Sequence, residues 1–296
     1  MLEKVFKLRE NGTDVKTEVI AGITTFMTMA YILAVNPSIM SAAGMDSGAV
    51  FTATALAALL GTVLMAVFAN YPFALAPGMG LNAYFAYTVV GVYGYSWKVA
   101  LTAVFAEGII FIILSATNVR EAIFNAIPKN LKAAVSVGIG LFIAFIGLQN
   151  AKIVIGGSTL LQLYSLDNYN AANGVKATFH DVGITVLLAV IGILITGILV
   201  IRNIKGNILW GILITWLLGI GCQFAGIYVP NPDVGFYSLL PDFSNGLSIP
   251  SIAPVFAKLD FHSMFSLNFI VVVFAFLFVD MFDTIGTLIG VSSKAN

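Results

Sequence analysis

Residues 47–97 read SGAVFTATALAALLGTVLMAVFANYPFALAPGMGLNAYFAYTVVGVYGYSW and contain no Asp, Glu, Lys or Arg. A membrane span takes about 20 residues, so this charge-free run is too long for one span and must fold back on itself. The rest of the chain agrees, because 59% of its residues are hydrophobic and only 9% are charged. The mean hydropathy of +0.98 is far above that of a water-soluble domain. We therefore predict an all-α polytopic membrane protein.

A span length of about 20 residues, applied along the chain, predicts eight membrane segments. We place them at residues 18–40, 49–69, 71–90, 97–116, 133–149, 181–201, 207–227 and 264–292. With a cytoplasmic N-terminus, most of the 14 basic residues fall on the cytoplasmic side, as the positive-inside rule requires. We expect a multi-pass protein of the cell membrane, with the N-terminus and residue 296 in the cytoplasm. We also expect a surface helix in the loop 118–132 and a short interfacial helix at 249–256.

The third predicted segment is unusual, because YPFALAPGMG (residues 71–80) holds two prolines and two glycines. A continuous helix there would lose backbone hydrogen bonds that lipid cannot replace, so we expect an extended stretch shielded by protein or lining a cavity. A helix then begins near Gly80 or Leu81 and points its N-terminal amides into the middle of the membrane. Secondary transporters build binding sites from such interrupted helices. The alternative is a proline-kinked helix packed on its neighbours.

Asn82 is the polar side chain best placed to act with this helix end. Its amide donates and accepts hydrogen bonds at once, which suits a heterocycle that presents both kinds of group on one edge. Capping of the helix is the alternative role. The aromatic rings that follow could stack on a flat ligand or could simply pack. We predict that substrate binds at the start of this helix, to Gly80, Leu81, Asn82, Ala83, Tyr84 and Phe85.

Asp280 and Asp283 lie in the apolar stretch 261–289, where a charge costs roughly 2.5 to 3.5 kcal/mol at a helix centre. Residues i and i+3 share one helix face, so both carboxyl groups should face one cavity, with Thr284 beside them. Two carboxylates this close repel each other, so one should hold a proton near neutral pH. We predict that Asp280, Asp283, Thr284 and Glu107 of the fourth segment serve proton coupling, and that Asp280 also binds substrate. Capping of a local break by Asp283 and a structural role for Glu107 stay open.

Other classes of protein fit these residues less well. An anion carrier or channel, the main alternative, would place a cation or neutral groups beside its anion instead of two acids. An intramembrane aspartyl protease would carry its two acids on different helices, whereas these share one turn. The basic residues are scattered in short loops, unlike a nucleic-acid-binding surface. We predict no enzyme, no cofactor and no metal site, with the proton as coupling ion and the lipid bilayer as surroundings.

Three long stretches of the sequence resemble a known family. They are GITTFMTMAYILAVNP (22–37), FALAPGMGLNAYFAY (73–87) and FVDMFDTIGTLIGV (278–291), and in this order they resemble the AzgA-like purine permeases. That family belongs to the nucleobase:cation symporter superfamily, with the uracil and xanthine permeases. The resemblance implies that Asn82 and Asp280 contact a purine, with Asp283 in the same site or its coupling network. The implied substrates are hypoxanthine, guanine and adenine, imported with protons.

The resemblance also implies fourteen spans in two inverted repeats of seven, with a short strand and a half-helix in the third and tenth spans. A core domain, here residues 1–132 and 263–296, would carry the substrate, and a gate domain, here residues 133–262, would move against it by alternating access. A homodimer through the gate domain would suit this plan. The sequence ends after the eighth predicted segment, before the six further spans and a substrate-binding glutamate of the tenth. We therefore expect that residues 1–296 alone do not transport purines.

Overall fold

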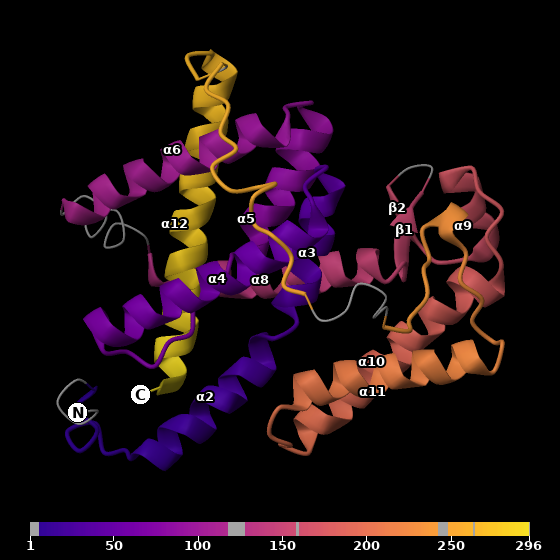
Figure 1. Cartoon of the computed structure of the whole chain (residues 1–296), viewed down its shortest axis with the longest axis horizontal. Helices are drawn as coiled ribbons and strands as arrows, with labels where there is room; N and C mark the ends of the chain where they lie inside the picture. Colours follow the sequence, from indigo (N-terminus) through magenta and orange to yellow (C-terminus); the bar gives the residue numbers. More distant parts are fainter. Residues whose placement is uncertain (1–5, 118–127, 158–159, 242–247, 263, 296) are drawn as a thin grey trace. The chain divides into compact units, whose positions relative to one another are not determined.

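The computed structural model describes residues 6–117, 128–157, 160–241, 248–262 and 264–295 (Figure 1). Within these residues, six helical segments are long and apolar enough to cross a membrane. Two shorter apolar helices, Met79–Val92 and Val137–Asn150, accompany them. Each of the eight overlaps one of the predicted segments, so the prediction of a polytopic helical membrane protein is confirmed.

The chain forms two compact units, and each unit combines two separate stretches of sequence. The first unit comprises Met1–Tyr31 and Ala144–Ser248, and the second comprises Ile32–Ile143 and Ile249–Asn296. The first predicted segment consists of two helices, α2 (Val15–Met29) in the first unit and α3 (Ile32–Ala42) in the second. The chain therefore passes from one unit to the other in the middle of this segment.

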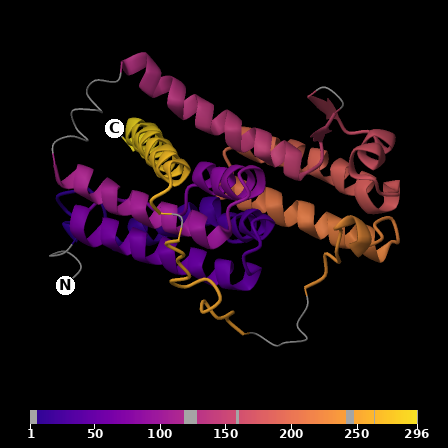
Figure 2. The ribbon, with the colours of Figure 1, turned by 90° about the horizontal axis from the view of Figure 1, so that it is seen from above.

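The first unit is built around an antiparallel pair of helices, α10 (Ile184–Ile201) and α11 (Asn207–Phe224), which lie side by side in Figures 1 and 2. Gly192 of α10 faces Thr215 of α11, and Gly211 of α11 faces Thr196 of α10. A Cβ built on Gly192 would lie 2.5 Å from the Thr215 hydroxyl oxygen. Small residues at both crossing points therefore let the two backbones approach closely, as is common between membrane helices.

The remaining elements of the first unit are short. They are the end of α8 (Lys129–Asn150), β1 (Val154–Gly156), β2 (Leu161–Leu163), α9 (Leu166–Asn173), the π-helix η3 (Phe179–Gly183) and the 3₁₀-helix η4 (Pro232–Val234). Strands β1 and β2 form an antiparallel hairpin in which Ile155 pairs with Gln162. Ile155, Tyr169, Ala177 and Val182 form a small apolar core under this hairpin.

The second unit holds the predicted site. Its helices are α3, α4 (Ser47–Leu64), the π-helix η1 (Met65–Ala69), α5 (Met79–Ala83), the π-helix η2 (Tyr84–Val92), α6 (Trp97–Ala116), the start of α8, and α12 (Leu267–Ala295). Asp46 caps the start of α4, where its side chain accepts a hydrogen bond from the Ala49 N–H at 2.7 Å. Helix α12 packs against α6 and α5, while α3 packs against α4 and α5 (Figure 1).

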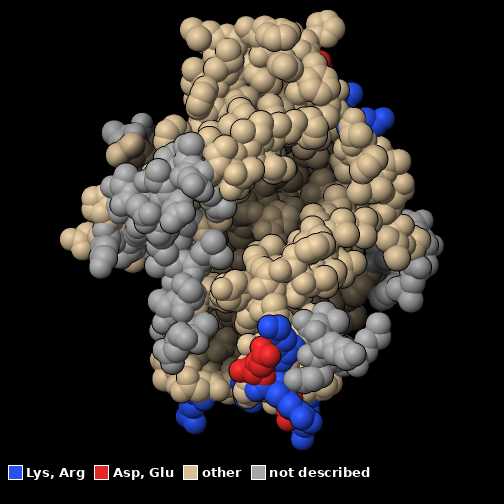
Figure 3. Space-filling model, turned by 90° about the vertical axis from the view of Figure 1, so that its left-hand side faces the viewer, with Lys and Arg blue, Asp and Glu red and all other residues tan. Residues whose placement is uncertain are grey.

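The outer faces of these helices are apolar, as expected for surfaces in contact with lipid. Leu60 and Phe68 of the second segment, for example, are 61% and 82% exposed. Neutral residues cover most of the described surface that faces the viewer in Figure 3, and most of the charged side chains seen there gather toward its lower end. Burial in a membrane would remove this large apolar area from water.

Two expected loop helices have different outcomes. Residues 118–127 of the predicted surface helix lie outside the described residues, and the following Lys129 already begins α8. The interfacial helix expected at 249–256 is wrong, because this stretch forms a turn in which the Val255 and Phe256 N–H groups both bond Ile252 O at 3.0 Å. Its two prolines lack N–H donors, which disfavours a regular helix.

Candidate functional site

The backbone of the extended stretch 70–78 is hydrogen-bonded to a side chain of helix α4. Asn70 ends η1 in the left-handed conformation, with φ of 54°, which asparagine tolerates better than most residues. The Thr62 hydroxyl accepts a hydrogen bond from Leu75 N–H at 3.0 Å and donates one to Leu75 O at 3.3 Å. One threonine therefore satisfies both backbone polar groups of a residue that could find no water partner in lipid.

The half-helix that follows begins at Met79, close to the predicted start at Gly80 or Leu81. Gly78 is its N-cap residue, and α5 continues without interruption into the π-helix η2. The third segment is thus an extended stretch followed by a half-helix. The described part of the extended stretch carries no strand pairing.

Asn82 lies at the end of a directional chain of hydrogen bonds through three helices. Its Nδ2 donates to Oδ1 of Asn36 on α3 at 2.5 Å, and Asn36 Nδ2 donates to the Thr54 hydroxyl of α4 at 2.6 Å. The Thr54 hydroxyl donates in turn to Val50 O at 2.7 Å. Asn36 and Thr54 are only 5% and 2% exposed, whereas Asn82 is half-buried. The chain therefore joins a buried polar core to a side chain that keeps access to its surroundings.

Asp283 of α12 lies against the start of α5. A Cβ built on Gly78 would lie 2.7 Å from Asp283 Oδ2, so the carboxylate occupies the space that a larger residue would fill. Gly78 O accepts a hydrogen bond from Asn82 N–H at 3.1 Å, which places the carboxylate and Asn82 at the same helical turn. The positive end of a helix favours a negative charge at this position.

Asp280 meets Glu107, which the sequence places on a different segment. The side chain of Glu107 on α6 lies within interaction distance of the Asp280 side chain on α12, and Asp280 also interacts electrostatically with Asp283. Glu107 is 5% exposed, and its Oε1 is buried without a hydrogen-bond partner among the described residues. An ionised carboxylate can only accept hydrogen bonds, so a bond between two carboxyl groups requires a proton on one of them.

The aromatic rings after Asn82 contact α12. Tyr84 meets Phe276 edge-on with ring centroids 5.1 Å apart, and Phe85 lies 6.4 Å from the same ring. Phe85 is 3% exposed and Phe276 is fully buried, whereas Tyr84 is partly accessible. These contacts fix α5 and η2 against α12, and stacking of either ring on a ligand stays a prediction.

The remaining predicted residues surround this turn. Ala83 is buried, Gly80 and Leu81 are half-buried, and a Cβ on Gly80 would lie 3.8 Å from the ring of Phe142. Thr284 is half-buried on α12, one residue beyond Asp283. Their roles in binding and coupling stay predictions.

Thr54 and Thr62 were missed in the sequence, where they look like ordinary threonines of an apolar helix. Asn36 and its neighbour Pro37 look like a kink with interhelical hydrogen bonds, which does not by itself indicate a place in the site. One signal in the sequence was the free-energy cost of burying an unpaired carboxamide at membrane depth. Because of this cost, such a side chain needs hydrogen-bond partners on neighbouring helices. That cost predicts partners for Asn36, but it does not identify them.

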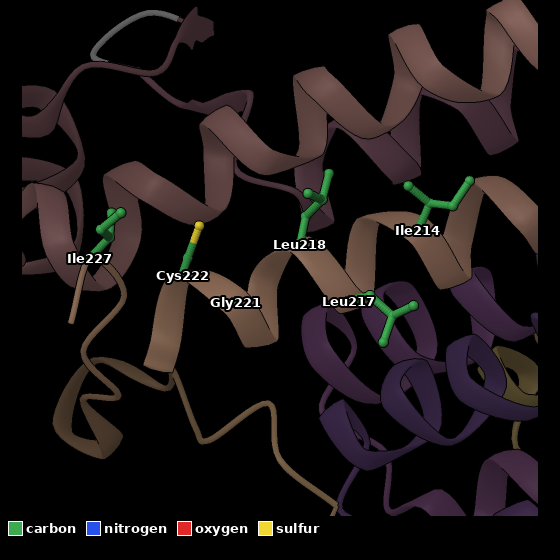
Figure 4. A pocket seen from close by; sticks show the side chains of 6 residues that line it. All are labelled: Ile214, Leu217, Leu218, Gly221, Cys222 and Ile227. Atoms are coloured by element: carbon green, nitrogen blue, oxygen red, sulfur yellow. The ribbon is translucent and has the colours of Figure 1, made fainter. Parts of the chain in front are cut away.

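Two cavities of the first unit contain none of the predicted site residues. One is lined by Ile214, Leu217, Leu218, Gly221, Cys222 and Ile227 at the end of α11 (Figure 4). The other runs along α10 and α11 past Gly192 and Gly211. Both cavities are lined mainly by apolar side chains, whereas a path for a polar ligand would need polar side chains along it. In the described part of the chain, no three His, Cys, Asp or Glu side chains gather as metal ligands would.

An interrupted helix that meets the acids of α12 within an apolar bundle is an arrangement typical of secondary membrane transporters. Comparison with known families agrees, since the profile of the permease family (Xan_ur_permease) matches residues 16–296. The chain belongs to this permease family.

Individual relatives carry nucleobase names. The chain is 41% identical to the adenine permease AdeP of Escherichia coli (strain K12), over 100% of the chain and 60% of the relative. It is 43% identical to the guanine/hypoxanthine permease PbuO of Bacillus subtilis (strain 168), over 98% of the chain and 62% of the relative. It is 40% identical to the guanine/hypoxanthine permease PbuG of the same species and strain, over 99% of the chain and 63% of the relative. The chain thus spans about three fifths of the length of these relatives.

Proposed function

We propose that this protein imports purine nucleobases (hypoxanthine, guanine or adenine) together with protons across the cell membrane by alternating access. The observation that carries the proposal is the meeting of Asp283 with the first turn of α5, which also bears Asn82. Membership of the permease family and the names of the relatives support the substrate class.

The substrate would bind at the start of α5. Asn82 offers an acceptor oxygen and one N–H that the Asn36 bond leaves over, and a purine edge presents the complementary pair. An ionised Asp280 would accept ring or exocyclic N–H groups. The backbone of Gly80, Leu81 and Ala83 and the rings of Tyr84 and Phe85 would complete the contact.

The coupling proton would reside on the acids of α6 and α12. A hydrogen bond between Glu107 and Asp280 would require one shared proton, and the ionised partner could accept a further hydrogen bond from a ligand. A purine N–H that bonds Asp280 would therefore compete with Glu107 for the same oxygen atoms. Asp283 and Thr284 lie on the same helix and would tune this exchange.

The larger architecture remains part of the proposal. Residues 1–132 and 263–296 would carry the site, and residues 133–262 would form the gate that moves against it. The N-terminus and residue 296 would face the cytoplasm, and the gate would provide the surface for a homodimer. These assignments follow from the distribution of basic residues and from the resemblance to purine permeases.

The test is uptake of labelled hypoxanthine by cells that lack their own purine carriers and express the complete reading frame. We expect uptake that guanine or adenine displaces and that a protonophore abolishes. Asp280→Asn should abolish it, whereas Asp233→Asn, an exposed acid of η4, serves as the matched control. Displacement by sulfate or bicarbonate, with no effect of purines, would favour an anion carrier.

A further inference from the structure

The chain of hydrogen bonds behind Asn82 has a fixed direction. Its last acceptor, Val50 O, is a backbone carbonyl, so Thr54 must use its only O–H to donate there at 2.7 Å. The Thr54 oxygen can then only accept, and it accepts from the amide of Asn36 at 2.6 Å. Because the Nδ2 group of Asn36 donates to Thr54, the Oδ1 atom of Asn36 faces Asn82 and accepts from it.

Asn82 is therefore the last member of a polarised series. It must donate from Nδ2 to Asn36 at 2.5 Å, and a carboxamide rotated by 180° would place two acceptor oxygens against each other. No other side-chain hydrogen bond of Asn82 is found among the described residues. Its Oδ1 and second N–H are consequently offered in one orientation only.

We propose that Asn36 and Thr54 are positioning residues that lock the Asn82 carboxamide and thereby select between 6-oxopurines and 6-aminopurines. A 6-oxopurine presents an N–H at N1 and an acceptor at O6, while a 6-aminopurine presents an acceptor at N1 and an N–H at N6. In one binding pose these two edges demand opposite orientations of a bidentate carboxamide. A locked amide matches one edge and opposes the other, whereas a freely rotating amide serves both.

The inference rests on the proposed function, because it assigns selectivity to the same site. Burial supports it: Asn36 and Thr54 are nearly inaccessible, so neither can contact a ligand itself. Their effect must pass through Asn82. It follows that removing the Thr54 hydroxyl should change the ratio of affinities for the two purine classes, and not only the affinity itself.

The test is displacement of labelled purine by unlabelled hypoxanthine and adenine, with the complete reading frame in membrane vesicles. Thr54→Val keeps the shape of the side chain and removes the anchor, and Thr54→Ser keeps the hydroxyl as the conservative control. We expect the hypoxanthine-to-adenine affinity ratio to move about 10-fold toward one in Thr54→Val, the scale of one bidentate contact, and to be restored in Thr54→Ser. A general packing defect would weaken both ligands together and leave the ratio unchanged.

A second pair of variants carries the same contrast if Thr54→Val does not reach the membrane. In Asn36→Asp the new side chain still accepts a hydrogen bond from Asn82, so the hypoxanthine-to-adenine affinity ratio should stay at its wild-type value. In the similarly sized Asn36→Leu it cannot accept one, so the affinity ratio should move toward one. A wild-type ratio near one, or an unchanged ratio in Thr54→Val or Asn36→Leu, overturns the inference. Absence of purine binding by the wild type would instead overturn the proposed function, so the two failures are distinguishable.

Discussion

Replacement of Gly78 by alanine tests the close approach of Asp283 to the half-helix. The backbone at Gly78, with φ of −71° and ψ of 119°, suits any residue, so the substitution adds no backbone strain. The new Cβ would lie 2.7 Å from Asp283 Oδ2, closer than the 3.0 Å that real Cβ atoms respect. The carboxylate or the start of α5 must therefore move by at least a few tenths of an ångström.

The expected cost follows from that displacement. A misplacement of about 1 Å in a functional group can cost roughly 100-fold in rate, so a shift of a few tenths should lower purine uptake by about 10-fold. Labelled hypoxanthine uptake, normalised to the protein in the membrane, measures the effect. Gly108→Ala on α6 is the matched control, because its Cβ would meet nothing within 4 Å. Uptake at the wild-type rate in Gly78→Ala would refute the proposed contact between Asp283 and this helix turn.

Three further substitutions test other parts of the account. Thr62→Val leaves the Leu75 backbone unpaired and should lower the free energy of unfolding by about 1–3 kcal/mol, as measured by unfolding in detergent, while Thr62→Ser should be neutral. Gly211→Leu overpacks the α10–α11 contact and should cost about 1–3 kcal/mol, whereas Gly197→Leu meets open space; equal stability of the two would contradict the close packing. Glu107→Gln keeps a donor toward Asp280 but cannot give up its proton, so purine exchange should persist while proton-driven accumulation is lost; full accumulation would exclude Glu107 from coupling.

The sequence was sufficient for the architecture because its signals are local. The charge-free run 47–97 requires several spans, and the prolines and glycines of residues 71–80 require an interruption, whatever the rest of the chain does. The helix after Gly78 begins within two residues of its predicted start. Local signals do not extend to the turn at 249–256, where apolar composition resembles an interfacial helix but two prolines prevent one.

The site was only partly predictable because its contacts join residues far apart in the chain. Helical periodicity places Asp280 and Asp283 on one face, and it cannot show that Glu107 from another helix meets Asp280. The same limit hid Thr54, whose partner Asn36 lies on a different helix. Residue identity alone indicates which polar side chains cost free energy in a membrane. The packing of the helices decides which of these side chains contact one another. The division into residues 1–132, 133–262 and 263–296 also depends on such long-range packing and remains a prediction.

The most direct measurement of the central claim is proton movement during purine binding and uptake. Protein from the complete reading frame, reconstituted in liposomes that contain a pH-sensitive dye, would be given hypoxanthine without an imposed gradient. We expect acidification of the lumen that accompanies purine entry and that disappears in Asp280→Asn. Purine entry without any proton flux, or an Asp280→Asn variant that moves both at the wild-type rate, would contradict it.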